Sequence, residues 1–278
     1  MKRISCIQLL IVKTRINPAG FTLTELLVVI SIIAVLMAII TPVLRNSRQQ
    51  AKTVLCSSNI RQLTMVLLQY EIENKTFPYG FYDAPNLPAP PEGYSGFIQY
   101  DRTGWWWLNY TRGFYIKTDE RNTIVKCPSK YVKDSKLNKD ILCGNYGVNL
   151  SVCKSSDDGI PLKMSDITKP SETLLIADSG YAIIGWRHAA DIPPTFTHKT
   201  QIENTYIPGL SINKNKTLLA VQKAEALYGR HHNKTVNAGF ADGHMQIMKA
   251  EEFLVEKTGE SYKNKVPLWE PNKSISQR

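Results

Sequence analysis

The pattern of apolar and polar positions changes twice along the first part of the chain, after Leu44 and again near residue 75. From Phe21 to Leu44 the chain is apolar, and Glu25 is the only charged residue in that stretch. At ~1.5 Å per residue these positions span about 36 Å, more than the ~30 Å hydrocarbon core of a bilayer. The pattern therefore predicts a membrane-spanning helix over residues 21–44.

A periodic stretch follows the apolar run. Between residues 45 and 75 apolar side chains recur at helical spacing, at Ala51, Leu55, Ile60, Leu63, Leu67 and Tyr70. We expect an amphipathic continuation of the same helix to about Asn74, with its apolar face packed on the rest of the chain; a coiled-coil partner is the alternative. Pro42 removes one helical hydrogen bond and clashes with the preceding turn, so a kink or local melting is expected there.

Residues 76–278 predict a globular α+β domain. The continuously apolar segment 173–177 favours a buried central strand. Near the end of the chain, the segments 235–240 and 245–248 flank Asp242-Gly243, and Asp-Gly between alternating segments is a strong hairpin signal. The fold class is thus a long amino-terminal helix packed on an antiparallel sheet.

Three consecutive tryptophans, Trp105 to Trp107, lie in the first part of this domain. A strand would point Trp105 and Trp107 to one face and Trp106 to the other, so that at least one would be exposed. Burial against the long helix is one interpretation, and a platform for a sugar or peptide ligand is the other.

Charge indicates which way the chain is inserted. The formal net charge is +10, and the first 20 residues hold four cations and no acid, at Lys2, Arg3, Lys13 and Arg15. A cationic amino-terminal segment tends to stay cytoplasmic, so the bulk of the chain should lie outside the inner membrane. The remaining basic residues are scattered and no nucleic-acid-binding motif accompanies them, so we expect no nucleic acid partner.

A small residue at the junction indicates processing before the apolar run. A secretory signal would place its cleavage site after that run, whereas here the evident cut point is Gly20, ahead of it. The anchor would therefore survive cleavage.

The run GFTLTELLVVISIIAVLMAIITPVL, residues 20–44, resembles the amino-terminal signal of the type IV pilin and type II secretion pseudopilin superfamily, with Thr24 where an apolar residue is usual. The resemblance implies a leader over residues 1–20 and a prepilin peptidase that cuts between Gly20 and Phe21 and methylates the new amino terminus. It also implies a pilin-like fold.

Glu25 needs a reason to be in the apolar run, because a charged side chain inside a spanning helix costs ~2.5 to 3.5 kcal/mol by insertion scales. It lies one helical turn beyond Phe21. Glu25 could pair with its own terminal amine, or with that of a neighbouring subunit and so set the axial register of a filament. An interfacial acid exposed to head-group water is the remaining interpretation.

A second resemblance covers more of the chain. His232, nine intervening residues and Asp242-Gly243, followed by His244, are similar to the pilin-like family named for its His-x9-Asp-Gly motif. Other matching pieces occur in order: Cys56-x-x-Asn59-x-x-Gln62-Leu63, Cys127-Pro128-Ser129, residues 170–175 with Asp178, and residues 240–244.

The chemistry of that motif leaves two roles open. His231, His232, Asp242 and His244 are ligand types that suit zinc, and a hairpin could bring them together. Alternatively, Asp-Gly serves the turn and a histidine braces it, which is the role we expect. No nucleophile motif, phosphate loop or paired-carboxylate pattern supports an enzyme, so we expect no catalysis, no metal and no cofactor.

The cysteines suit an exported domain. Cys6 would leave with the leader, and the remaining four allow three pairings in an oxidising compartment. We expect Cys56 to pair with Cys127, fastening the helix to the sheet, and Cys143 to pair with Cys153. Free buried thiols are the alternative.

These features predict a non-enzymatic pseudopilin or minor pilin subunit that assembles through its amino-terminal helix in a type II secretion-like or type IV pilus-like system. Its partners would be the prepilin peptidase, other pilin or pseudopilin subunits and the inner membrane. The alternative is a membrane-anchored periplasmic or surface binding protein, for polysaccharide or another ligand, that uses the prepilin signal for display.

Overall fold

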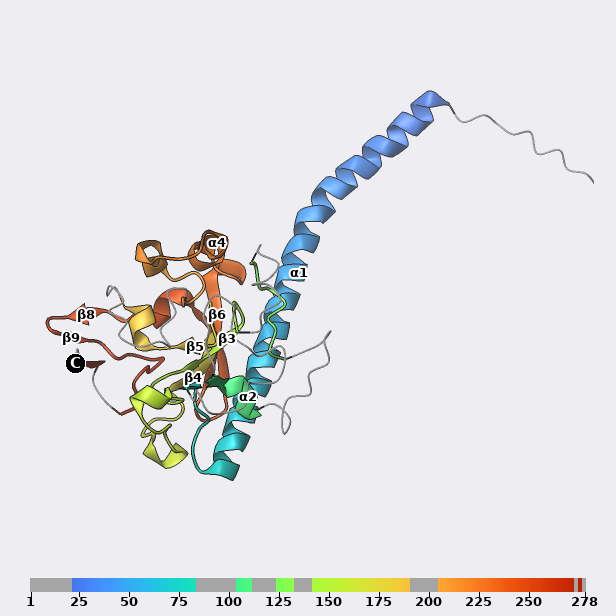
Figure 1. The fold of residues 1–278 in the computed structure, drawn as a ribbon. Coiled ribbons are helices and arrows are strands. Elements are labelled where there is room, and N and C mark those ends of the chain that lie inside the picture. Colours follow the sequence, from blue (N-terminus) through green and yellow to red (C-terminus); the bar gives the residue numbers. More distant parts are fainter. Residues whose placement is uncertain are drawn as a thin grey trace, which may run out of the picture. The chain divides into compact units, whose positions relative to one another are not determined.

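The computed structural model describes residues 22–83, 104–111, 124–132, 142–190, 205–272 and 275–276. The chain forms two compact units, residues 1–46 and residues 47–278, and the boundary between them falls within the first helix (Figure 1). Gly20 and Phe21, where we expect processing, lie outside the described residues.

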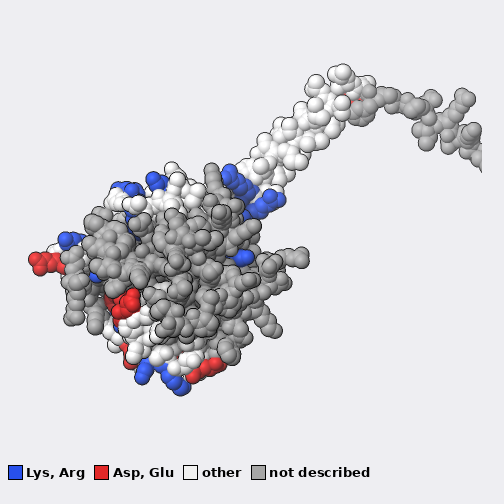
Figure 2. Space-filling view, viewed as in Figure 1, with Lys and Arg blue, Asp and Glu red and all other residues white. Residues whose placement is uncertain are grey.

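Helix α1 spans Leu23–Asn74, and its first half forms the described part of the first unit. The side chains of this half are exposed and apolar, and its surface is nearly without charge (Figure 2). In the described part of the chain, α1 alone is long and apolar enough to cross a membrane, by length and composition. Pro42 lies inside α1 with helical residues on both sides, so local melting does not occur there, while the kink stays a prediction.

The second half of α1 belongs to the globular unit and buries one face. The buried positions are Cys56, Ile60, Leu63, Thr64 and Leu67. Leu55 is 57% exposed and Ala51 is also exposed, so these two residues are not part of the packed face, contrary to the expectation from the periodicity. The helix ends at Asn74, as the periodicity predicts, and Lys75 follows with φ 63°, a left-handed conformation that stops a helix.

Five strands form the main sheet: β3 (Tyr146–Asn149), β4 (Leu174–Asp178), β5 (Ile183–Ile184), β6 (Thr235–Phe240) and β7 (Met245–Lys249). Their order is β5-β3-β4-β6-β7, which places the predicted strand β4 at the centre. β6 and β7 form the predicted antiparallel hairpin. The sheet is mixed rather than wholly antiparallel, because β5 pairs in parallel with β3. The short link 179–182 crosses the start of β3, so β4 and β5 lie on opposite edges of β3 and β5 runs in the same direction as β3.

Smaller elements surround this sheet. β1 (Phe81–Asp83) pairs with β2 (Gly104–Trp106), which runs into α2 (Trp107–Thr111), while β8 (Lys257–Thr258), β9 (Ser261–Tyr262) and β10 (Ile275–Ser276) form a separate sheet. The other helices of the described segments are α4 (Ala220–Tyr228) and the 3-10 turns η1 (Ser156–Asp158), η2 (Met164–Asp166), η3 (Trp186–Ala189), η4 (Ser211–Asn215), η5 (His232–Lys234) and η6 (Ala250–Phe253).

Both faces of the main sheet are covered. Ile176 of β4 belongs to the buried cluster that includes the α1 face, whereas the next residue, Ala177, belongs to a second cluster with Phe240 and Trp269. A strand covered on both faces has no polar alternation, which explains why β4 is a continuous apolar run in the sequence.

Two of the three consecutive tryptophans, Trp106 and Trp107, are part of the core. Trp106 and Trp107 are 0% and 1% exposed, and the strand ends between them rather than running through all three. Trp106 packs against Phe81, and the indole N–H of Trp107 donates to the carbonyl of Ala182 at 2.8 Å. The expected exposure of one face therefore does not hold for these two residues, and neither forms a surface platform for a ligand.

Candidate functional site

The start of α1 holds Glu25 in a local hydrogen-bonded arrangement. The backbone N–H and the hydroxyl of Thr22 both donate to Oε2 of Glu25, at 2.8 and 2.7 Å, and the N–H of Glu25 donates back to the Thr22 hydroxyl at 3.2 Å. This reciprocal pattern is a capping box, which satisfies free N–H groups at a helix start. Glu25 thus has a partner on its own chain. That partner, Thr22, is the residue after the expected new terminus.

The His-x9-Asp-Gly positions are not brought together. The hairpin pairs Thr235 with Lys249, so His232 lies beyond its open end, whereas Asp242 and His244 lie at its turn. Six residues of β6 separate the two, which corresponds to about 20 Å of extended chain. A metal site that joins His232 to Asp242, considered from the sequence, is therefore wrong.

At the turn, the motif residues brace one another. Nδ1 of His244 lies 2.6 Å from Oδ1 of Asp242, and the same oxygen accepts the backbone N–H of His244. The His244 ring stacks on Phe240 at 4.3 Å between centroids. Burial alone would raise the pKa of the Asp242 carboxyl, but the hydrogen bonds and the charge of His244 together outweigh burial and lower it.

Glycines let this hairpin lie directly on α1. Gly243 has φ +96°, and a Cβ there would lie 3.2 Å from Leu68 and 3.3 Å from Met65. At Gly239 in β6, a Cβ would lie only 2.1 Å from Oγ1 of Thr64. The segment that carries the motif is thus a docking surface for the helix.

His231, next to the motif histidine, is the buried one. Its Nε2 lies 3.1 Å from Oδ2 of Asp178 and its Nδ1 lies 3.2 Å from the Thr53 hydroxyl. Oδ2 of Asp178 also accepts the backbone and side-chain N–H groups of Asn237, at 2.7 and 2.8 Å. Burial alone would raise the pKa of Asp178, but His231, Arg230 and the Asn237 N–H outweigh burial and hold it below its usual value.

Arg230 extends this network. Its guanidinium contacts both Glu225 and Asp178, with both side chains fully buried, and donates to the backbone carbonyls of Asn145 and Ser179 at 2.7 and 3.0 Å. The two carboxylates raise the pKa of Arg230 despite its burial. The three side chains carry two negative charges and one positive charge into the interior. A buried cluster of this kind is stable only while each member keeps its partners.

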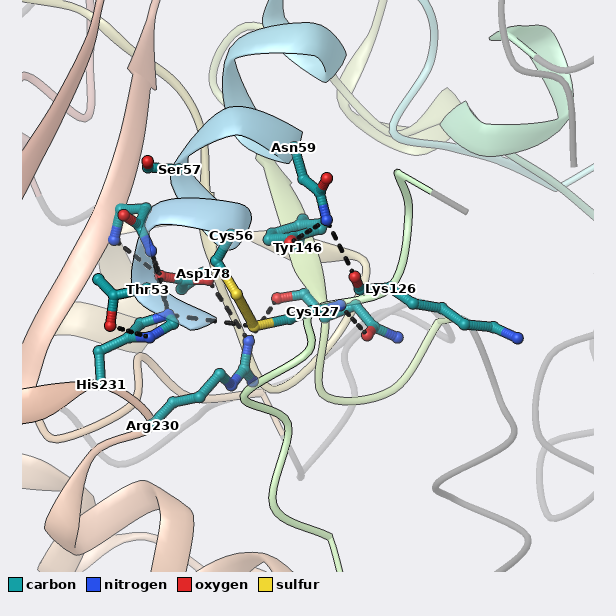
Figure 3. The surroundings of a disulfide bond; sticks show 12 residues. Thr53, Cys56, Ser57, Asn59, Lys126, Cys127, Tyr146, Asp178, Arg230 and His231 are labelled. Atoms are coloured by element: carbon teal, nitrogen blue, oxygen red, sulfur yellow. Dashed lines mark hydrogen bonds and ion pairs between the residues drawn. A yellow bond between two sulfur atoms is a disulfide. The ribbon is translucent and has the colours of Figure 1, made fainter. Parts of the chain in front are cut away.

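A disulfide lies against this network. The structure joins Cys56 of α1 to Cys127, the pair expected from the sequence, with a Cα–Cα distance of 5.4 Å. Nε2 of His231 lies 4.0 Å from Sγ of Cys127 (Figure 3). Cys127 is further held by its N–H, which donates to Oδ1 of Asn145 at 3.0 Å.

The second expected disulfide is wrong. Cys143 and Cys153 are both buried thiols in the structure. Strand β3 lies between them, and its four extended residues cover ~13 Å, whereas a disulfide needs Cα atoms roughly 4.4 to 6.8 Å apart. Burial raises the pKa of the Cys153 thiol, which keeps it protonated and unreactive.

Sequence reasoning missed most of this network. Asp178 entered only as part of a family resemblance, and His231 only as a neighbour of His232. An acid at the end of a buried strand and an adjacent Arg-His pair were the available signals. Neither indicates that the two segments meet, because their pairing depends on the sheet order.

Comparisons with known proteins point to the amino-terminal segment. Residues 15–41 match the prokaryotic N-terminal methylation motif. The chain is similar to the type II secretion system core protein G of Pseudomonas aeruginosa, with 31% identity over 79 residues, 28% of this chain and 56% of that protein. It is also similar to the type IV wide pilus major component PilA4 of Thermus thermophilus, with 36% identity over 61 residues, 22% of this chain and 47% of that protein.

The chain thus spans about half the length of each of these relatives. No solved structure matches it. The resemblance to pilins and pseudopilins is confirmed over the amino-terminal part of the chain, whereas the resemblance to the His-x9-Asp-Gly family stays as the sequence states it.

Proposed function

We propose that this protein is a non-enzymatic pseudopilin or minor pilin subunit that assembles through α1 in a type II secretion-like or type IV pilus-like system. The observation that carries the proposal is the methylation motif at residues 15–41, followed by a helix long and apolar enough to span a membrane. The subunit is anchored by this single span in the inner membrane, with the domain that follows in the periplasm or on the cell surface.

In this proposal a prepilin peptidase cuts after Gly20, so that Phe21 becomes the methylated amino terminus. The new amine is then four residues from Glu25, whose carboxylate already accepts from Thr22. In an assembled filament the carboxylate neutralises the terminal amine of a neighbouring subunit, which offsets the cost of burying either charge alone. The capping box keeps Glu25 satisfied before assembly.

The attachment of α1 within the second unit also supports assembly through this helix. α1 from Ser47 onward is fixed to the rest of the globular unit by the disulfide from Cys56 to Cys127, which lies in the segment 124–132 and not in the sheet, contrary to the expectation from the sequence, and by its buried face. A load applied to this part of the helix therefore passes into the globular unit rather than peeling the helix away. This arrangement suits a subunit that assembles with other secretion or pilus components, which is what the relatives' names indicate.

Three variants at two neighbouring positions separate assembly from insertion and from capping. Glu25→Val removes both the charge and the cap, whereas Glu25→Gln removes the charge but keeps a side chain that completes a capping box. Thr24→Val, one residue away, is the control for added apolar surface. We expect all three to enter the membrane fraction, and only Thr24→Val to form cross-linked multimers in cells as the wild type does.

Each result has a definite meaning. Assembly by Glu25→Gln but not by Glu25→Val would reduce the role of Glu25 to capping. Assembly by both Glu25 variants at the wild-type level would overturn the register role altogether.

A further inference from the structure

Three potential metal ligands converge where the disulfide meets the buried network. Cys56, Cys127 and His231 each offer one ligand atom, these atoms all lie within 4.8 Å of one another, and all three residues are buried. They come from α1, from the segment 124–132 and from the residue before η5 (Figure 3). Three separate segments thus place two sulfurs and one imidazole nitrogen at one point.

Nε2 of His231 faces the sulfurs, 4.0 Å from Sγ of Cys127. In the disulfide form this nitrogen has two other polar neighbours, Oδ2 of Asp178 at 3.1 Å and the side-chain amide of Asn237 at 3.0 Å. Nδ1 lies 3.2 Å from the Thr53 hydroxyl, which donates to the carbonyl of Gln49 and can therefore accept from Nδ1. Metal binding at Nε2 needs the ring proton on Nδ1, and metal-binding histidines are held in this way, with the second ring nitrogen donating to a fixed partner.

A buried carboxylate oxygen supplies an independent indication. Oδ1 of Asp178 is buried and makes no hydrogen bond within the described part of the chain; Arg230 approaches it only to 3.6 Å. Oδ2 of the same residue lies 3.1 Å from Nε2 of His231. Asp178 is thus in direct contact with the imidazole and is placed to orient it.

We propose that reduction of the Cys56–Cys127 disulfide converts this position into a zinc-type site formed by Cys56, Cys127 and His231, with Asp178 beside the imidazole as the group that orients it. Two thiolates and one imidazole are the ligands that zinc and its substitutes prefer in tetrahedral sites. This inference does not depend on the proposed function. It concerns a different set of residues from the His-x9-Asp-Gly motif, because His232, Asp242 and His244 take no part.

The conversion balances in atoms and charge. A dithiol reductant transfers two electrons and two protons to the disulfide, becoming a disulfide itself and leaving two thiols on the protein. Binding of a divalent cation then releases those two protons. A disulfide and a dication with two thiolates have the same net charge, so the conversion adds no uncompensated charge beside the buried network of Asp178, Arg230 and Glu225. The sulfurs need only separate from ~2.05 Å to about 3.8 Å, as two zinc–sulfur bonds of ~2.3 Å require.

The first test uses the wild-type full-length protein in detergent, reduced without oxygen and freed of reductant. We expect it to bind one equivalent of Co²⁺ with a thiolate-to-cobalt charge-transfer band, and Zn²⁺ to displace the cobalt. The oxidised protein should bind none. Zinc should also slow alkylation of Cys56 and Cys127 at least tenfold, measured by peptide mass, while leaving Cys143 and Cys153 unchanged.

Matched variants assign the ligands. Cys56→Ser should abolish the charge-transfer band, and His231→Ala should weaken cobalt binding at least tenfold, whereas His232→Ala and Cys143→Ser should bind as the wild type does. The alkylation measurement needs no variant and so holds even if His231→Ala does not fold. Absence of the band in the reduced wild type, or its persistence in Cys56→Ser, would overturn the proposal, as would equal alkylation with and without zinc.

Discussion

Gly239 is the position where the packing of the helix on the sheet can be tested by adding one methyl group. It lies in β6, and a Cβ there would lie 2.1 Å from Oγ1 of Thr64, 2.9 Å from Cγ2 of Ile176 and 3.2 Å from Cγ2 of Ile60. Thr64 and Ile60 belong to the buried face of α1. Gly239→Ala must therefore push the helix and the strand apart.

The expected cost follows from these distances. Overpacking a well-packed core costs roughly 1 to 3 kcal/mol, and a methyl group that meets neighbours on both the helix and the adjacent strand belongs at the upper end. We expect Gly239→Ala to lower the free energy of unfolding by about 3 kcal/mol. For a unit of this size that corresponds to a fall in melting temperature of roughly 6 to 12 °C.

The measurement is denaturation of the oxidised full-length protein in detergent, followed by tryptophan fluorescence. Gly185→Ala is the control, since a Cβ there would have its nearest neighbours at an ordinary 3.8 Å. We expect the control to stay within about 0.5 kcal/mol of the wild type. Removing the clashing hydroxyl with Thr64→Ala should recover part of the loss, with a coupling energy of ~1 kcal/mol or more. A wild-type melting temperature for Gly239→Ala, or additive effects in the double variant, would refute the packing.

Three further predictions concern the turn, an internal histidine and the disulfide. Gly243→Val should cost about 1 to 3 kcal/mol of unfolding free energy because φ is +96°, and His244→Ala should cost less, both measured by denaturant unfolding. Burial lowers the pKa of His188 to about 3 from an ordinary ~6.5, so the native state binds fewer protons between these values. The contribution of His188 to stability should therefore be full above pH ~6.5 and fall by up to about 5 kcal/mol as pH drops to 3, and His188→Asn should flatten that part of the pH dependence in denaturant unfolding. Cys127→Ser opens a loop with a sequence separation of 71 and should lower the unfolding free energy by ~4 kcal/mol, whereas the same denaturation series on Cys153→Ser should show a much smaller change.

Local patterns in the sequence predict the strongest elements well. The apolar segment 173–177 is the central strand β4, and Asp242-Gly243 is the turn between β6 and β7. The helix ends at Asn74 as its periodicity indicates. Each of these depends on nearest neighbours in the chain, which is why sequence alone is sufficient.

Features that depend on distant segments could not be predicted in the same way. The parallel pairing of β5 with β3 arises because the short link 179–182 crosses the start of β3. Cys143 and Cys153 are close in sequence, yet an extended strand holds them apart. His231 meets Asp178 only because β4 and β6 are adjacent, so the buried network has no local sequence signature.

The most direct test of the proposed function is the mass of the amino terminus of the protein extracted from membranes of cells that contain a prepilin peptidase. The account predicts a chain that begins at Phe21 and carries one added methyl group on its terminal amine, and a chain that retains Gly20 and the residues before it when the peptidase is absent. A mature chain that begins after the apolar run, or an unprocessed chain in the presence of the peptidase, would contradict it.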